Sequence, residues 1–150
     1  MGTNKQIQVK LTKAGDVLLL KDRLRQEDLA DLRASGSTPL RSLMEGYAFS
    51  DECYSVFVDN LIIGMFGFCK LTHSIWFLGS DECDDYKREW LKVARYYIRH
   101  FLELSNVLAN TVSIENKLHI KWLKRMGAKF SVPYLINNHY FQDFYIIKGE

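Results

Sequence analysis

Four side chains of this sequence could act as a general base: Glu45, Glu52, Glu115 and His119. A carboxylate or a neutral imidazole can take the proton of an ammonium nucleophile, directly or through a water molecule. Each also has a structural interpretation. Glu115 falls in a turn, Glu45 and Glu52 border a short helix, and a solvated helix face would suit His119. The residue types therefore indicate acid–base chemistry without assigning the base.

The remaining histidines and the cysteines lack the spacing of a metal site. An odd number of cysteines without a Cys-x-x-Cys motif fits free thiols in a reducing cytosol better than disulfides or zinc. We therefore expect no metal cofactor. The residues concerned are His73, His100, His139, Cys53, Cys69 and Cys83.

One stretch, Thr111 to Phe130, contains a complete series of elements around two of the candidates. Its β-branched start favours a strand, and Asn116 supplies a side-chain oxygen that can cap a helix. Apolar residues at steps of four, with lysines and arginines on other faces, predict an amphipathic helix after Asn116. Gly127 then ends the helix, because a residue without a Cβ takes the left-handed cap conformation at little cost.

This spacing of strand, Asn116, short helix, Gly127 and Phe130 resembles the C-terminal half of GCN5-related N-acetyltransferases, the GNAT family. The segments NKLHIKWLKRMGAKF and FYIIKGE also resemble the family of the small internal virion protein A of T7-like podoviruses, with its acyltransferase-like relatives. The resemblance implies a phage-encoded acyltransferase that moves an acetyl group from acetyl-CoA to an amine acceptor of unknown identity.

The same resemblance implies a place for the cofactor. In GNAT enzymes the strand before the long helix exposes main-chain groups to the pantetheine arm of acetyl-CoA, and the following loop holds the pyrophosphate. The cofactor-binding residues implied in this chain are Trp76, Phe77, Leu78, Gly79, Ser80 and Asn116.

Two departures from the family pattern favour a different outcome. The loop GSDECDD carries Asp81, Glu82, Asp84 and Asp85, which would stabilise a helix start but repel a pyrophosphate. Leu123 stands where many GNAT enzymes have a tyrosine that returns a proton to CoA, and leucine cannot donate one. The alternative is a catalytically degenerate GNAT fold that acts as a virion assembly or host-protein-binding module.

Periodicity along the chain predicts an α/β (α+β) GNAT-like fold, with a mixed, mostly antiparallel central sheet of about seven strands flanked by about four helices. Strands are expected at 6–12, in a hairpin over 54–70 that turns at Asp59-Asn60, at 74–79, at 111–114, and in a final pair at 128–136 and 140–148. Helices are expected at about 26–34, 40–49, 85–104 and after Asn116. We expect residues 1–150 to form a single GNAT-like domain.

Composition, net charge and the lengths of apolar runs limit the class of protein and its partners. The chain is 47% hydrophobic and 25% charged, as is typical of soluble domains. Its net charge of +2 is too small to indicate nucleic acid by itself, and we do not expect nucleic acid as a partner. No apolar run approaches the ~20 residues of a membrane span, and no signal-peptide core begins the chain. These features indicate a protein that stays inside a cell. The phage resemblance implies the host cell cytoplasm or the virion as its location, with a host or virion protein as partner.

The segment from Lys117 to Lys129 carries five lysines and arginines and no acid. A solvated helix face is the usual explanation for such a run. Contact with the phosphates of CoA or of a nucleic acid is the functional alternative.

Overall fold

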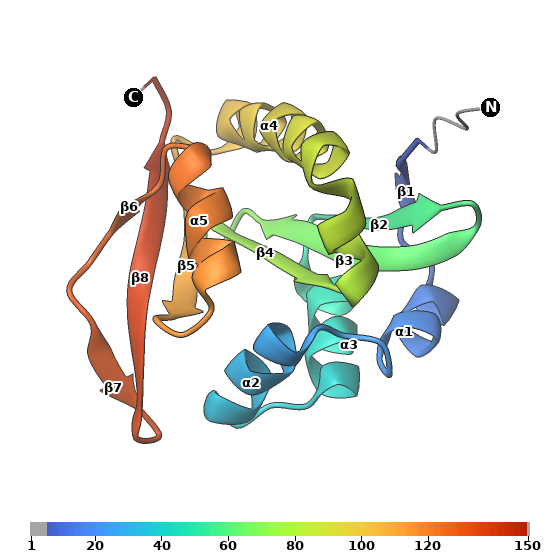
Figure 1. Cartoon of the computed structure of the whole chain (residues 1–150). Helices are drawn as coiled ribbons and strands as arrows, with labels where there is room; N and C mark the ends of the chain where they lie inside the picture. The colour runs from blue at the N-terminus through green and yellow to red at the C-terminus, as the bar shows by residue number, and fades with distance from the viewer. Residues whose placement is uncertain (1–5, 150) are drawn as a thin grey trace.

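The computed structural model describes residues 6–149, in which eight strands and five α-helices follow one another with one 3-10 helix (Figure 1). In chain order the elements are β1 (Gln8–Leu11), α1 (Ala14–Leu20), α2 (Gln26–Ala34), α3 (Pro39–Phe49), β2 (Glu52–Val58), β3 (Leu61–Cys69), β4 (Ser74–Gly79), η1 (Asp81–Tyr86), α4 (Lys87–Leu104), β5 (Val107–Ser113), α5 (Lys117–Arg125), β6 (Lys129–Phe130), β7 (Tyr134–Ile136) and β8 (His139–Ile147).

The strands form one sheet in the order β1-β2-β3-β4-β5-β8-β6, and β7 also pairs with β8. Every pairing is antiparallel except that of β4 with β5, which is parallel and consists of the single register pair Ser74 and Ala109. The two strands then diverge in a V. The expected mixed, mostly antiparallel sheet is confirmed.

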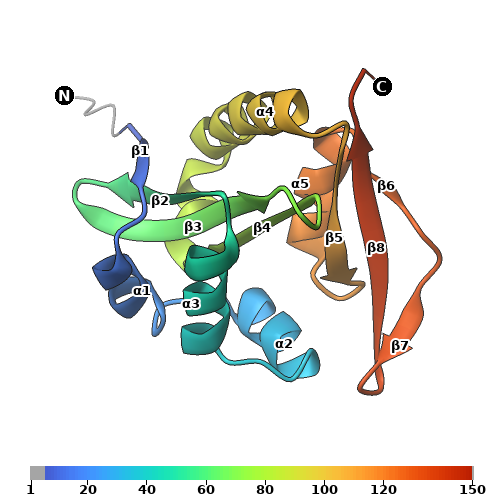
Figure 2. The ribbon, with the colours of Figure 1, turned by 180° about the vertical axis from the view of Figure 1, so that it is seen from behind.

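Helices cover both faces of the sheet (Figures 1 and 2). On one face α4 and α5 bury a large apolar cluster that includes Phe68, Trp90 and Trp122. On the other face α1 and α3 bury a smaller cluster around Val17, Leu43 and Met65. The amphipathic patterns of the long helix and of the helix after Asn116 thus predicted their buried faces correctly.

Two tight turns were predicted from residues that tolerate positive φ, and both are present. Asp59 and Asn60 have φ of 49° and 66°, and Asn137 and Asn138 have φ of 49° and 64°. Two consecutive left-handed residues are the backbone of the two-residue hairpin turn that matches the twist of its strands. These turns fix the registers of β2 with β3 and of β7 with β8.

The structure differs from the expected layout in three places, so that seven strands become eight and four helices become five. The apolar cluster at 17–20 belongs to α1, whose exposed Leu18 and Leu19 hide the amphipathic pattern. The expected loop 79–85 is largely η1. The expected strand 128–136 is divided into β6 and β7, because three residues, 131 to 133, lie opposite only two, Gln142 and Asp143, of β8.

Candidate functional site

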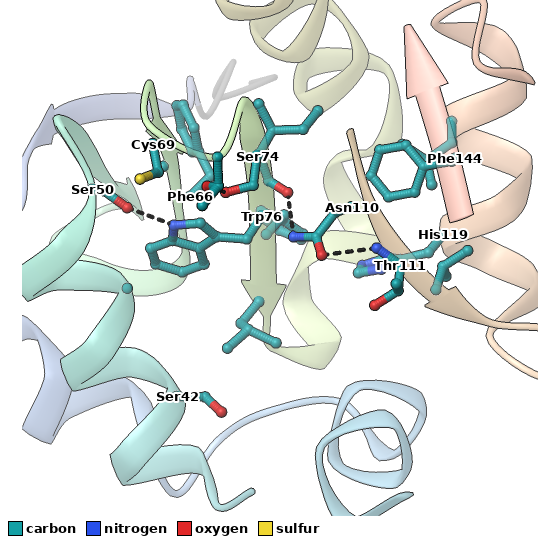
Figure 3. Close-up of a pocket in the computed structure, with 18 of the residues that line it drawn as sticks. Ser42, Ser50, Phe66, Cys69, Ser74, Trp76, Asn110, Thr111, His119 and Phe144 are labelled. Atoms are coloured by element: carbon teal, nitrogen blue, oxygen red, sulfur yellow. Dashed lines mark hydrogen bonds between the residues drawn. The ribbon is translucent and has the colours of Figure 1, made fainter. Parts of the chain in front are cut away.

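The V between β4 and β5 is the natural place for a site, because a parallel pair that separates leaves main-chain groups without a neighbouring strand. At its closed end the Ala109 N–H donates to the carbonyl of His73 at 2.8 Å. One step further, the side-chain amide of Asn110 donates to the carbonyl of Ile75 at 2.8 Å and replaces the missing ladder bond (Figure 3). Beyond Ile75 the two strands share no register pair.

A cavity of about 990 Å³ occupies the V and reaches both sides of the sheet. On the side of α4 and α5 its walls are apolar and include Trp90, Trp122 and Leu123. On the side of α3 they include Glu45, Ser50 and Asp51. The cavity is large enough for a small-molecule ligand.

The side chains of β4 that were expected to bind the cofactor point to the two faces of the sheet. The Trp76 indole turns toward α3, where its Nε1 donates to Ser50 Oγ at 2.8 Å (Figure 3). The Phe77 ring turns to the other face and stacks on Trp90, with ring centroids 4.4 Å apart. The Phe77 peptide group points into the V, because alternate residues of a strand share a side and the Ile75 carbonyl and the Gly79 N–H both point there. Leu78 also lines the cavity.

Gly79 and Ser80, at the open end of the V, already have partners within the protein. The Gly79 N–H donates to Asp28 Oδ2 at 3.0 Å, and the Gly79 carbonyl accepts from the Arg25 N–H at 2.8 Å. The Ser80 N–H donates to the carbonyl of Ile63 at 2.9 Å. The start of α2 therefore occupies both main-chain groups of Gly79, and β3 occupies the Ser80 N–H.

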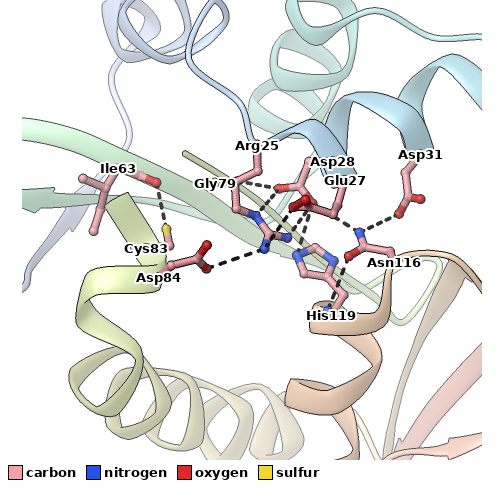
Figure 4. A network of polar contacts seen from close by, with 10 residues as sticks. All are labelled: Arg25, Glu27, Asp28, Asp31, Ile63, Gly79, Cys83, Asp84, Asn116 and His119. Atoms are coloured by element: carbon pink, nitrogen blue, oxygen red, sulfur yellow. Dashed lines mark hydrogen bonds and ion pairs between the residues drawn. The ribbon is translucent and has the colours of Figure 1, made fainter. Parts of the chain in front are cut away.

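A buried polar network built around Asp28 fills this end of the V (Figure 4). Arg25 is 0% exposed, and its Nη2 lies 2.9 Å from Asp28 Oδ1. The side-chain amide of Asn116 donates to Asp28 at 3.3 Å and to Asp31 at 2.9 Å. His119 Nε2 lies 3.4 Å from Asp28 Oδ1. One carboxylate thus connects α2, β4 and α5.

Burial sets the protonation states in this network. It raises the pKa of Asp31 to about 6, against the opposing effect of the hydrogen bond from Asn116. It lowers the pKa of His119, so that the imidazole is neutral at pH 7 despite the nearby Asp28. Burial alone would lower the pKa of Arg25, but the charge of Asp28, its hydrogen bond, and the charges of Glu27 and Asp84 together outweigh burial, so the pKa is raised. The centre of the network is therefore an Arg25–Asp28 ion pair.

The acids of η1 also face protein cations. Glu82 forms an ion pair with Arg23, and Asp84 Oδ1 lies 3.9 Å from Arg25 Nη1. They were expected to stabilise a helix start and to repel a pyrophosphate. Their additional role is to hold the connection between α1 and α2 against the end of β4.

These contacts do not fit the pyrophosphate of CoA. The Gly79 N–H is bonded to a carboxylate, and an anion beside it would meet Asp28 and Asp84 directly. The arginine within reach, Arg25, is already paired with Asp28. In this arrangement the Gly79 end of the V offers a pyrophosphate neither the N–H of Gly79 nor the guanidinium of Arg25.

The structure brings two of the candidate bases to the cavity. Glu45, on α3, accepts from Arg41 Nε at 2.8 Å and lines the cavity, and His119 lines it from α5. Glu115 is exposed in the turn before α5 and is not among the lining residues. Glu52, at the start of β2, instead accepts a hydrogen bond from the Tyr54 hydroxyl and contacts His100 of α4. No single pair of these groups forms an acid–base dyad among residues 6–149.

Asn116 caps α5 as predicted, and its side chain also makes a second set of contacts. Its side-chain oxygen accepts from the His119 N–H at 3.4 Å, as a helix cap does, while its amide holds Asp28 and Asp31. The sequence patterns did not single out Arg25, Asp28 or Asp31. Their only signal was the i, i+3 spacing of Arg25 and Asp28, which is common on exposed helices.

Comparison with known proteins links this chain to a phage family. The family model described as "Bacteriophage T7, probable scaffold protein Gp13" matches residues 52–135. The scaffold protein gp13 of Escherichia phage T7 is 29% identical over 126 residues, which cover 81% of this chain and 85% of that protein. The predicted relation to T7-like phages is thus confirmed at the level of Gp13.

Comparison with solved structures shows the fold. A GNAT-family acetyltransferase from Bacillus anthracis superposes with a TM-score of 0.69 at 12% identity, covering 99% of this chain and 98% of that one. The aminoglycoside acetyltransferase AAC(6')-Ib, solved with ribostamycin and coenzyme A, gives 0.70 at 12% identity, with coverage of 95% and 94%. A spermidine N-acetyltransferase from Vibrio cholerae, solved with CoA and spermine, gives 0.66 at 12% identity, with 95% and 96%.

The predicted GNAT fold is therefore confirmed. Among the described residues no cluster of three metal-binding side chains is present. Within residues 6–149 no helix combines the length and the apolar character needed to cross a bilayer.

Proposed function

Because this chain belongs to the family of the T7 scaffold protein Gp13, we propose that it is a GNAT-fold module that acts in phage virion assembly by binding another virion protein. It acts in the infected host cell, as one domain, and without acetyl-CoA. We also propose that the Gp13 family is the same family that the sequence resembled, the one named after internal virion protein A.

The hydrogen bond from the Gly79 N–H to Asp28 carries the proposal. It belongs to a network whose cation, Arg25, is fully buried, and a buried ion pair is costly to separate. A ligand that needed the end of β4 would have to break this network and expose both charges. The fold is thus used with its cofactor entrance occupied by its own α2.

A second candidate is an acetyltransferase-like enzyme with an unknown amine acceptor. The cavity through the V favours it, since the Phe77 peptide group faces the cavity and Glu45 and His119 stand on its walls. Under this alternative α2 would have to leave Gly79 before acetyl-CoA could bind at 76–80 and Asn116. Glu115, remote from the cavity, has no role in either proposal.

The melting temperature with and without excess acetyl-CoA separates the two. A ligand at a hundred times its dissociation constant adds about 2.7 kcal/mol, which would raise the midpoint of a domain of this size by about 5–10 °C. We expect no shift at millimolar acetyl-CoA. A shift of that size would overturn the proposal in favour of the enzyme.

A complementation assay tests the assembly role itself. In cells infected by phage that lack this gene, the plasmid-borne wild-type protein and Glu45→Gln should restore the same yield of infectious particles. Glu45 forms an exposed ion pair with Arg41, so we expect the substitution to leave the fold intact. Loss of yield with Glu45→Gln, at normal protein levels, would contradict a purely structural role.

A further inference from the structure

A second concave surface lies on the outside of α5, away from the V. It is a groove of about 710 Å³ between α5, the segment that joins β6 to β7, and β8. Its rim consists of Lys117, Lys121, Lys124 and Arg125. We call it the α5 groove.

The four cations share one helix face. At roughly 100° per residue they fall within about 100° of arc, while Trp122 of the same helix is buried against the core. All four side chains are exposed. None of the ion pairs formed among residues 6–149 involves them. The groove therefore presents four uncompensated positive charges in one direction.

The floor of the groove is apolar and has a defined origin. Ile114, in the turn after β5, and Ile120 of α5 form this floor, and Pro133 lies on the opposite wall. Pro133 belongs to the bulge at 131–133, which Ser131 anchors by accepting from the Asp143 N–H at 2.9 Å and by donating its own N–H to the Asp143 carbonyl at 2.9 Å. Proline cannot donate to a ladder, so the chain stays open here and leaves a hollow beside α5.

From this combination we infer that the α5 groove binds an acidic peptide segment of a partner protein, with carboxylates on the basic rim and an apolar side chain on the floor. Charge complementarity fixes the sign of the partner. The apolar floor favours a peptide over a nucleic acid, since phosphates gain nothing from it and the groove contains no aromatic ring on which a base could stack. The lysines act as point charges, so that they can pair with carboxylates in many geometries.

The α5 groove is separate from the Gly79 end of the V, on which the proposed function rests. The groove is on the exposed side of α5, whereas the buried network lies at the helix start and below its inner face. Binding at the groove would therefore persist whether or not acetyl-CoA enters the V.

Fluorescence anisotropy with a labelled peptide of alternating glutamate and leucine tests the inference on the full chain. We expect the peptide to bind wild type at low salt and to be weakened by added salt. The double variant Lys117→Glu/Lys121→Glu should lose at least about tenfold in affinity, or about 1.4 kcal/mol. The matched control is Lys87→Glu/Lys92→Glu on α4, which makes the same charge change outside the groove and should stay within about twofold of wild type.

Three results would overturn the inference. Equal loss of affinity in both double variants would show that the peptide responds to overall charge and would remove any role of the groove. Tight binding of a peptide with glutamine in place of glutamate would remove the role of charge. Binding of a short DNA duplex, with loss in Lys117→Glu/Lys121→Glu and no binding of the peptide, would make the groove a nucleic-acid surface. Unchanged melting of each variant confirms that folding is not the cause.

Discussion

The carboxylate of Asp28 accepts a hydrogen bond from the main-chain N–H of Gly79 at 3.0 Å, and so joins the first turn of α2 to the last residue of β4. The same carboxylate receives Arg25 and Asn116, and it lies beside His119. In a sheet whose β4 and β5 diverge, this one side chain bridges the two sides of the gap. The GNAT fold is closed here by charge and hydrogen bonds rather than by apolar packing.

Removing the charge of Asp28 should destabilise the protein strongly. Asp28→Asn keeps the shape but removes the only buried counter-charge of Arg25 among its ion pairs within residues 6–149, leaving the partly exposed Glu27 and Asp84 at 3.8 and 3.9 Å. We expect this to cost about 3–5 kcal/mol. The double variant Arg25→Met/Asp28→Asn should recover part of that loss, because no uncompensated charge remains. Urea unfolding measures both effects.

The control for this prediction is Glu45→Gln, which breaks the exposed pair with Arg41, whose side chains are 51% and 68% exposed. It should change the free energy of unfolding by no more than about 0.5 kcal/mol. If Asp28→Asn costs no more than this control, the network does not hold the V closed.

Asp31 should make stability depend on pH. Its pKa is about 6 in the folded protein and about 3.9 in an unfolded chain, so the folded state binds the proton more tightly. The resulting stabilisation is present below the unfolded pKa and is lost as pH rises from about 4 through about 6, by at most about 1.4 kcal/mol per pH unit.

The measurement is the difference in unfolding free energy between wild type and Asp31→Asn at several pH values. Taking the difference removes the contribution of His119, whose lowered pKa acts in the opposite direction. The difference should fall across this window and be flat above it. A flat curve for Asp31→Asn would mean that the carboxyl is solvated.

Gly67 should tolerate no side chain, because Trp76 lies against it. A Cβ there would be 2.6 Å from Trp76 Nε1 and 2.7 Å from Ser50 Oγ, so Gly67→Ala should cost about 1–3 kcal/mol. Gly15→Ala is the matched control, since nothing lies within 4 Å of its Cβ position in α1. That change should stabilise by about 0.5–1 kcal/mol. Equal effects of the two changes, measured by urea unfolding, would show that Trp76 moves freely.

Much of the fold is visible in local sequence because local rules determine it. Asp59-Asn60 and Asn137-Asn138 make turns of positive φ, and Gly127 takes φ of 87° after the helix that Asn116 begins. The strand at Ser74–Gly79 was predicted with its observed bounds. The short α1 was missed because Leu18 and Leu19 are exposed on its outer side, which gives the segment no polar face.

The candidate site was less predictable because its main contacts are long-range and involve main chain. Arginine is among the residue types that are least often buried, so nothing marked Arg25 as the centre of a network. The partner of Asp28 is the N–H of a residue 51 positions away, and a main-chain donor has no sequence signature. The family resemblance located the strand and Asn116 correctly but could not show that α2 occupies the end of the V.

The three thiols should differ sharply in reactivity. Cys69 is partly exposed, and hydrogen bonds involving Thr72 lower its pKa. Burial raises the pKa of Cys83 to about 12 and also raises that of Cys53. Because the thiolate is the reactive form, one thiol should react rapidly with Ellman's reagent and two should react only on unfolding.

Cys69→Ser should therefore remove the fast phase, whereas Cys53→Ser should leave it unchanged. A fast phase that survives in Cys69→Ser would show that a buried segment opens in the native protein.

Cys69 also lines the cavity of the V, so its labelling rate reports on whether a ligand occupies that cavity. With the entrance closed by Asp28, millimolar acetyl-CoA should leave that rate unchanged, and protection of Cys69 by acetyl-CoA would show that α2 can release Gly79.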